Sequence, residues 1–240
     1  MSHLAGIHPV REALRAGRPL ESVWIAIGAA GPRLQEIIDL CRDRHVPVRF
    51  EPRPSLDRKV ASAAHQGVIA FGAAEKYASL EQTAAAGGLH VILDGVEDPH
   101  NLGAIVRTAH AAGAAAVVIP ERRAVGLTET VERSAAGALS YIPVVRVANI
   151  SRAIEYLKER KYWIYGLDER GTESYDRVEY TAPTALVLGG EGKGLHQTVA
   201  KHCDFLVSIP MGISGSQAGV ASLNVSVAAG VVLFEWKRRN

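Results

Sequence analysis

The sequence contains few sulfur atoms, and neither its cysteines nor its histidines form a metal-binding pattern. Cys41 and Cys203 are the two cysteines among 240 residues, and neither belongs to a CxxC pair. The nine histidines form no HExxH or CxxC…HxxxH spacing. These absences argue against a disulfide-stapled miniprotein, a structural zinc site and a dithiol redox centre. We therefore expect no bound metal.

Long apolar runs are also missing. No stretch approaches the roughly 18 uncharged residues of a membrane-spanning helix, and the N-terminus MSHLAGIHPV has no apolar signal-peptide core. We therefore expect a soluble, cytoplasmic protein without a membrane partner. With 48% hydrophobic and 22% charged residues, the chain can bury a full core without covalent support.

The net charge is only +2, but the basic residues are unevenly distributed. Residues 1–73 hold 10 Lys and Arg against 7 Asp and Glu, and nine of the ten cations are arginines. Arginine binds phosphate oxygens in pairs through its planar guanidinium, so this region is a candidate for contact with nucleic acid. A solvated surface of mixed charge is the plainer alternative.

The apolar pattern divides the chain into a small α/β unit, a linker and a larger α/β unit. In residues 1–73 it predicts helices over 10–17 and 32–45, and strands over 22–28, 46–52 and 67–73. Residues 74–88 form a linker with some helical character. From Leu89 onward, continuous apolar strands alternate with helices, which indicates a parallel sheet covered on both faces. Ligands of such sheets bind beyond the carboxyl ends of the strands, so we expect the functional residues in three loops that follow strands.

The first loop is LDGVEDPHNLGAIVRTA, residues 93–109. Asp98 or Asn101 can cap the helix that follows, and Pro99 fits its first turn. If Asn101 is the cap, Arg107 lies nearly two turns inside the helix. Capping and a solvated helix face would by themselves explain these polar residues.

The second loop is TALVLGGEGKGL, residues 184–195. Its four glycines let the backbone approach a ligand closely. The loop is not a P-loop, because Lys193 is followed by Gly194, and it does not fit GxGxxG. Glu191 inside the loop would repel phosphates. We therefore expect a ligand that carries no phosphate here, and a tight turn is the structural alternative.

The third loop is SIPMGISGSQAGVASLNVSVAAG, residues 208–230. Ser222 and Asn224 are natural N-caps of a helix that extends to about Arg238 and is apolar on nearly every face. Such a helix must be buried in the core, in a subunit interface, or in both. The absence of GxSxG removes an esterase nucleophile elbow.

Together, DPHNLGAIVRTA, LVLGGEGKGL and IPM…SLNVSVAAG resemble, in order and position, the three motifs of the SpoU (TrmH) family of RNA ribose 2′-O-methyltransferases. Residues 1–73, with GIHPVREAL and the HQG at 65–67, resemble the substrate-binding domain of its RlmB-like subgroup, which methylates a guanosine of 23S rRNA. The resemblance implies an L30e-like RNA-binding domain over 1–73 and a parallel-sheet methyltransferase domain with a deep trefoil knot over 89–240. It also implies a homodimer, which would cover the apolar final helix.

The resemblance further implies S-adenosylmethionine as cofactor and assigns residues to the site. The catalytic positions are Asn101, Arg107, Glu191, Ser222 and Asn224, and the cofactor positions are Leu188, Gly189, Gly190, Gly192, Gly194, Ile209, Met211 and Leu223. A guanidinium has a pKa above about 12, so we expect Arg107 to clamp a phosphate or the developing alkoxide rather than act as the base. Ser222 and Asn224 would orient the nucleophile and the cofactor. Glu191 would orient polar groups that contact them.

One segment departs from the family pattern. GISGSQAG separates Met211 from Val220, whereas most members have about half that length here, and this loop borders the expected cofactor pocket. Two alternatives therefore stay open. The substrate could be a tRNA or a resistance-linked ribosomal site, or the chain could be a catalytically silent RNA-binding or ribosome-assembly protein. The presence of all five catalytic residues argues against a catalytically silent protein.

Overall fold

The computed structural model describes residues 2–60, 65–72, 77–190, 194–212 and 222–240. By spatial contact the chain forms two compact units, one of residues 1–76 with 127–141 and one of residues 77–126 with 142–240. These units show which residues pack together, and packing does not show which segments fold independently. The domain boundaries at 73 and 89 therefore stay a prediction.

The N-terminal unit is built on a four-stranded sheet in the order β1-β4-β2-β3. Strands β2 and β3 pair in parallel, whereas β4 is antiparallel to both β1 and β2. The elements are β1 (Ser2–Ala5), α1 (Ile7–Arg15), β2 (Leu20–Ala26), α2 (Pro32–Asp43), β3 (Val48–Glu51), α3 (Arg53–Asp57) and β4 (Val68–Gly72), with α6 (Glu129–Ala135) and the 3₁₀ turn Ala138–Ser140 from the returning segment.

Sequence patterns predicted most of this unit but missed its shortest elements. Helix α1 begins at Ile7 rather than at residue 10, because Pro9 is tolerated in a first turn. Strand β1 and helix α3 were not predicted, since four or five residues are too short to show a period. Leu14, Ile25 and Ile37 are fully buried where α1 and α2 cover one face of the sheet.

Polar contacts fasten residues 127–141 to the rest of the N-terminal unit. The Tyr141 hydroxyl donates to a Glu12 carboxylate oxygen at 2.7 Å. Arg18 and Glu132 form an ion pair at 3.6 Å. These contacts join residues more than 110 positions apart, a pairing that no local pattern could show.

The C-terminal unit contains a seven-stranded sheet in the order β7-β6-β5-β10-β8-β11-β9, and every neighbouring pair is parallel. The predicted parallel α/β architecture is confirmed, and the two-residue strand β9 is an addition. The elements are α4 (Leu80–Ala85), β5 (Leu89–Asp94), α5 (Pro99–Ala112), β6 (Ala116–Pro120), β7 (Val144–Val147), α7 (Ile150–Glu159), β8 (Trp163–Leu167), β9 (Glu173–Ser174), β10 (Thr184–Gly189), α8 (Gln197–Ala200), β11 (Phe205–Ser208) and α9 (Val225–Arg239). Helix α4 supplies the helical character expected within 74–88.

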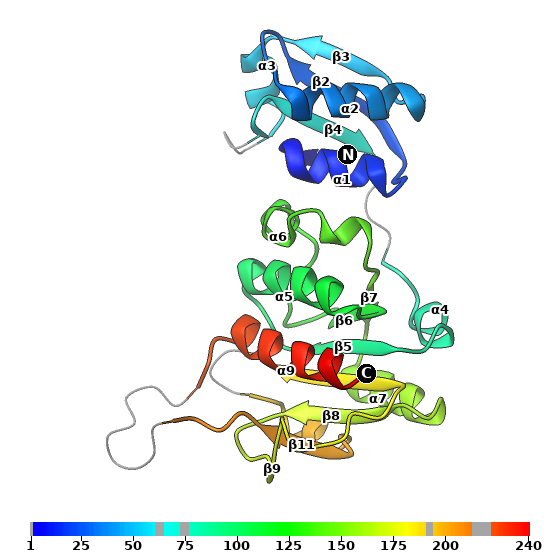
Figure 1. The fold of residues 1–240 in the computed structure, drawn as a ribbon, viewed down its shortest axis with the longest axis vertical. Helices are drawn as coiled ribbons and strands as arrows, with labels where there is room; N and C mark the ends of the chain where they lie inside the picture. The colour runs from blue at the N-terminus through cyan, green and yellow to red at the C-terminus, as the bar shows by residue number, and fades with distance from the viewer. Residues whose placement is uncertain (1, 61–64, 73–76, 191–193, 213–221) are drawn as a thin grey trace. The chain divides into compact units, whose positions relative to one another are not determined.

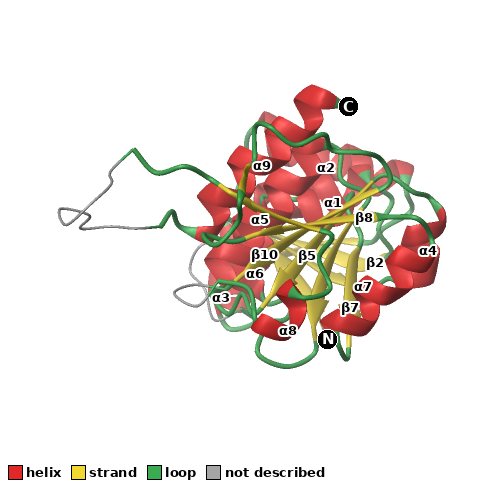
Figure 2. Cartoon of the chain, turned by 90° about the horizontal axis from the view of Figure 1, so that it is seen from below, coloured by secondary structure: helices red, strands yellow, loops and turns green. Residues whose placement is uncertain are grey.

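Helices cover both faces of this sheet (Figures 1 and 2). Helices α4, α7 and α8 pack on the face that carries Ile92 and Val187. Because side chains alternate along a strand, Leu93 and Leu188 point to the opposite face, where α5 and α9 lie side by side. The Trp236 indole N–H donates to the Thr184 hydroxyl at 3.0 Å and ties the end of α9 to the start of β10. Within the described residues, no helix is both long and apolar enough to cross a membrane.

His90 on β5 makes the stability of this unit depend on pH. Its side chain is fully buried, and this burial lowers the pKa of the imidazole from 6.5 to about 4. Between these pH values the unfolded chain binds a proton that the folded protein does not. His90 therefore does not lower the free energy of unfolding above about pH 6.5. As the pH drops from there to about 4, protonation of His90 in the unfolded chain lowers the free energy of unfolding by about 3 kcal/mol.

Urea unfolding at about pH 7 and pH 4.5 checks this expectation. In His90→Gln, the difference in unfolding free energy between the two pH values should be about 2 to 3 kcal/mol smaller than in the unsubstituted chain. The matched control is His110→Gln, because His110 is exposed. If His90→Gln keeps the full pH dependence, His90 is not its source.

Candidate active site

A cavity of about 700 Å³ lies at the carboxyl ends of β8, β10 and β11. This volume lies within the range of small-molecule and cofactor sites. The wall comes from four segments: 167–170 after β8, 188–190 with 194 around the end of β10, 208–211 after β11, and 222–225 with 228 at the start of α9. The position agrees with the rule that parallel sheets bind ligands beyond their carboxyl ends.

Two glycines at the end of β10 are required by the close approach of backbone. A Cβ atom on Gly189 would lie 2.1 Å from the Gly194 carbonyl carbon, and one on Gly190 would lie 2.1 Å from the Gly95 carbonyl oxygen. Gly190 and Gly194 also form a β-bridge. One wall of the cavity is therefore bare backbone, whose N–H and C=O groups can approach a ligand closely.

Asn224 joins the third predicted loop to the first. It caps α9, because its Oδ1 accepts hydrogen bonds from the backbone N–H and the hydroxyl of Ser226 at 2.9 and 2.6 Å. With Oδ1 engaged there, the Nδ2 group donates to Asn101 Oδ1 at 3.1 Å. Asn101 is 8% exposed and lies in the first turn of α5. The pair thus places two side-chain amides together beside the cavity, although 123 positions separate them.

The structure selects among the capping residues that the sequence offered. The N-cap of α5 is Asp98, whose carboxylate accepts from the His100 N–H at 2.8 Å, and Asn101 lies within the first turn. Pro99 follows the cap, as predicted. Helix α9 begins at Val225 rather than at Ser222, because the Asn224 side chain rather than the Ser222 hydroxyl caps it.

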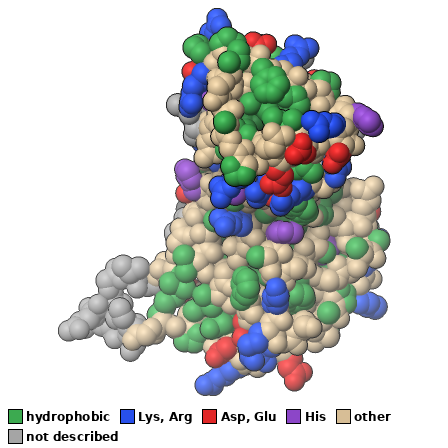
Figure 3. All heavy atoms as spheres, turned by 45° about the horizontal axis from the view of Figure 1, so that its top comes forward, with side chains coloured by type: hydrophobic (Ala, Val, Ile, Leu, Met, Phe, Trp, Pro, Cys, Tyr) green, Lys and Arg blue, Asp and Glu red, His purple; other side chains and the backbone are tan. Residues whose placement is uncertain are grey.

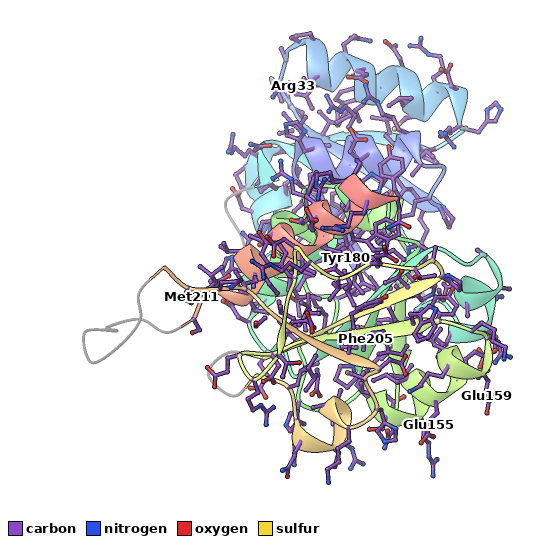
Figure 4. All side chains as sticks on the ribbon, turned by 60° about the horizontal axis from the view of Figure 1, so that its bottom comes forward. Arg33, Glu155, Glu159, Tyr180, Phe205 and Met211 are labelled. Carbon is purple, nitrogen blue, oxygen red and sulfur yellow. The ribbon has the colours of Figure 1, made fainter. Side chains whose placement is uncertain are left out.

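The predicted residues fall into three groups. Leu188, Gly189, Gly190, Gly194, Ile209, Met211 and Leu223 of the cofactor set line the cavity together with Ser222 and Asn224. Met211 lies on the segment between β11 and α9 (Figure 4). Glu191, Gly192 and most of the long loop after Met211 lie outside the described residues.

Asn101 and Arg107 form the third group, because neither is part of the cavity wall; Asn101 is joined to the wall through Asn224, whereas Arg107 is not. Arg107 is exposed on α5, six residues beyond Asn101, a distance of about 9 Å along a helix axis. No hydrogen bond or ion pair joins its side chain to another residue that the structure describes. Its guanidinium is therefore available to an external ligand.

Sequence reasoning missed a charged pair in the cavity wall. Asp168 and Arg170 follow β8, and the Arg170 guanidinium donates to both Asp168 carboxylate oxygens at 2.6 and 2.7 Å. These bonds hold the pKa of the Asp168 carboxyl below its ordinary value. The missed signal was the polar run at residues 168–170, where the predicted strand YWIYGLDE ends at the edge at which ligands bind.

The cavity wall offers backbone and side-chain polar groups rather than a set of metal ligands. Among the described residues, no group of three or more His, Cys, Asp or Glu is arranged to hold a metal ion. The arrangement can bind an elongated, partly apolar ligand against backbone. It can also present amide and hydroxyl groups to a second reactant.

Known families match both units of the chain. The profile of the SpoU rRNA Methylase family matches residues 88–234. The profile described as RNA 2′-O ribose methyltransferase substrate binding matches residues 4–78. Together they extend over nearly the whole chain.

Individual proteins agree with these profiles. A Bacillus subtilis protein, YacO, named within the TrmH family of tRNA/rRNA methyltransferases, is 42% identical over 99% of this chain and 96% of its own length. The SpoU methyltransferase AviRb from Streptomyces viridochromogenes, solved with AdoMet, superposes with a TM-score of 0.83 at 26% identity, covering 99% of this chain and 89% of AviRb. An AdoMet-bound rRNA methyltransferase from Sinorhizobium meliloti shares the fold, with a TM-score of 0.81 at 24% identity over 98% of this chain and 86% of that one. The chain therefore belongs to the SpoU (TrmH) family of RNA methyltransferases.

Proposed function

We propose that this chain transfers the methyl group of S-adenosylmethionine to a ribose 2′-oxygen of RNA, with a guanosine of 23S rRNA as the target. The observation that carries the proposal is the cavity with a glycine backbone wall beside the Asn224–Asn101 pair. The solved complex of AviRb with AdoMet supports the choice of cofactor. The match of residues 4–78 to a substrate-binding profile supports RNA.

The cavity residues fit S-adenosylmethionine. The backbone at Gly189 and Gly190 can approach an adenosine moiety without side-chain interference. Ile209, Met211 and Leu223 add apolar surface, and the last two are each 38% exposed at the cavity. The site also holds polar backbone from segments 188–190 and 208–210, which suits a ligand with an apolar body and polar ends.

The chain's contribution to the reaction is positioning and electrostatics. When bound, S-adenosylmethionine supplies an electrophilic methyl group and leaves as neutral S-adenosylhomocysteine, and the proton of the 2′-hydroxyl is released as H⁺. Ser222 and Asn224 orient the attacking ribose oxygen, and the cap of α9 holds the Asn224 amide in one orientation. Arg107 stabilises negative charge on a phosphate or on the developing alkoxide.

RNA recognition is assigned to the N-terminal unit, whose basic and acidic side chains are interspersed (Figure 3). Among the nine arginines of residues 1–73, Arg11 and Arg15 form ion pairs with glutamates and Arg42 with Asp39, while Arg44 donates to a backbone carbonyl. Arg33, Arg49 and Arg53 are exposed, and their side chains form no hydrogen bond or ion pair with any other described residue. These three are the best candidates for phosphate contact.

Mapping of 2′-O-methylation tests the substrate. RNA from a strain that lacks the gene should lose one 2′-O-methylguanosine in 23S rRNA, and the purified protein with S-adenosylmethionine should restore it. Loss of a mark in tRNA instead would assign the alternative substrate. Cofactor binding without any lost mark would contradict the enzymatic proposal and favour an assembly role.

We also propose a homodimer whose interface includes the outer face of α9. Val227 and Phe234 are 52% and 48% exposed on this helix, a high exposure for large apolar side chains. Light scattering at micromolar concentration should report twice the chain mass, and Phe234→Glu should shift it toward the monomer. Ile27→Glu, at an exposed apolar residue of the N-terminal unit, is the matched control. A monomer of the unsubstituted chain would contradict the proposal.

The remaining expectations from the family resemblance are proposals of the same kind. They are the trefoil knot in the C-terminal unit, the L30e-like fold of the N-terminal domain and a cytoplasmic location. The knot is supported by α9, which packs beside α5 and ends at the start of β10. The connections before and after β11 include residues 191–193 and 213–221, which lie outside the described residues.

A further inference from the structure

A second, smaller cavity of about 200 Å³ lies on the same edge of the seven-stranded sheet. Its wall contains Asp94 and Gly95 at the end of β5, Pro120, Arg122 and Arg123 at the end of β6, residues 149–151 at the start of α7, and His196, Thr198 and Val199 at α8. We propose that this cavity binds a phosphate of the RNA backbone next to the target ribose. The proposal rests on the proposed function, because RNA is taken as the substrate.

Charge is the first argument. Arg122 and Arg123 are exposed, and neither forms a hydrogen bond or an ion pair with another described residue. Two guanidinium groups at one small cavity repel each other unless an anion lies between them. Their planar donor groups match the oxygens of a phosphate.

The acidic residue in the wall offsets only one of the two positive charges. Asp94 is the only acidic residue among the described residues of the cavity. Both of its carboxylate oxygens are engaged by His196, one at 2.8 Å from the backbone N–H and the other at 3.0 Å from the ring Nδ1. This contact also fixes the orientation of the imidazole, so that Nε2 is the ring nitrogen left for a ligand.

The start of α7 adds donors on the other side of the cavity. Asn149 caps this ten-residue helix, and Ile150 and Ser151 of its first turn line the cavity. The first turn contains no acidic residue. Glu155 and Glu159 lie farther along the helix (Figure 4), and Glu155 is paired with His202. The positive end of the helix dipole and the two arginines therefore act in the same direction.

The register of the sheet places this cavity next to the cofactor cavity. Asp94 of β5 is paired directly with Gly189 of β10, and the Gly190 N–H donates to the Asp94 carbonyl at 2.9 Å. Adjacent strands are about 4.8 Å apart. A nucleotide whose ribose faces the Asn224–Asn101 pair can therefore place a neighbouring phosphate in the second cavity.

The test compares two double variants that remove the same charge from opposite edges of the sheet. Arg122→Gln/Arg123→Gln changes the cavity. Arg160→Gln/Lys161→Gln changes the residues just before β8, at the amino edge. Binding of a mixed-sequence single-stranded RNA 12-mer is measured by fluorescence anisotropy at several salt concentrations, and S-adenosylmethionine binding by calorimetry.

The cavity variant should bind the RNA about tenfold more weakly, with a salt dependence reduced by about one unit of slope, because one to two phosphate contacts are lost. The amino-edge variant should remain within about twofold of the unsubstituted chain. Both should keep their S-adenosylmethionine affinity. Unchanged RNA affinity in the cavity variant, or equal weakening in both variants, would overturn the proposal.

A third variant separates phosphate binding from general charge and from folding. Ser151→Asp places a carboxylate in the first turn of α7, where acidic residues stabilise a helix. It should leave the melting temperature unchanged or higher while weakening RNA binding, and added inorganic phosphate should compete less with the RNA. Unaltered RNA binding and phosphate competition would contradict the site.

The outcomes distinguish this inference from the proposed function. Arginine-dependent RNA binding without any methyl transfer would keep the phosphate site and reject the methyltransferase proposal. Methyl transfer to 23S rRNA, together with an unchanged RNA affinity of the cavity variant, would keep the methyltransferase proposal and reject the phosphate site.

Discussion

Gly189→Ala should weaken S-adenosylmethionine binding by at least about a hundredfold, which corresponds to about 3 kcal/mol. The added Cβ would lie 2.1 Å from the Gly194 carbonyl carbon and 2.5 Å from the Leu195 nitrogen. Both are backbone atoms, so β10 or the segment around Gly194 must move. Either movement deforms the backbone wall of the cavity. Calorimetry of cofactor binding measures the effect.

The control for this prediction is Gly212→Ala. Gly212 follows Met211 of the cavity wall, and a Cβ there would meet no atom of the described residues within 4 Å. The same chemical change should therefore leave cofactor binding within about threefold of the unsubstituted chain. If both variants bind the cofactor normally, the backbone wall is not the binding surface.

Arg107→Ala should lower the turnover number by about two orders of magnitude, a change of about 3 kcal/mol in the activation free energy. The reason is the loss of a cation that stabilises negative charge in the transition state. Folding and cofactor binding should persist, because Arg107 is exposed and lies outside the cofactor cavity. Single-turnover methyl transfer together with calorimetry measures both parts. Arg160→Ala, on the opposite edge of the sheet, is the control.

Arg107→Lys separates charge from geometry. Lysine retains the positive charge but lacks the planar group that contacts two oxygens at once. We expect this variant to resemble Arg107→Ala. If the turnover number of Arg107→Lys is within about threefold of that of the unsubstituted chain, charge alone suffices. If Arg107→Ala is fully active, Arg107 has no role in the site and is a solvated residue on the face of its helix.

The comparison of Arg107 with Asn101 shows how far a motif can predict a site. Both residues lie in the first loop and its helix, and the motif assigns them together. In the structure Asn101 contacts Asn224 at the edge of the cavity, whereas Arg107 lies on the exposed face of α5. A motif records which residues occur together along the chain, but helix periodicity decides the direction in which each one points.

The sequence by itself determined the parallel α/β architecture, and it predicted which strand-end loops would line a cavity. Strand and helix periods are local properties of ten to fifteen residues, and the apolar runs here are clear. The rule that ligands bind beyond parallel strand ends then directed attention to the three loops. Seven of the eight predicted cofactor positions line the cavity, and the eighth, Gly192, lies outside the described residues.

Only the tertiary structure decided which distant side chains meet. The strand order places β10 between β5 and β8. Along the chain, by contrast, β6, β7, β8 and β9 all lie between β5 and β10. That strand order puts Asp168 and Arg170 in the wall of the larger cavity, brings Asn224 to Asn101, and places Arg122 and Arg123 beside the start of α7. Such contacts depend on how buried faces pack across the whole sheet, which no local pattern of residues encodes.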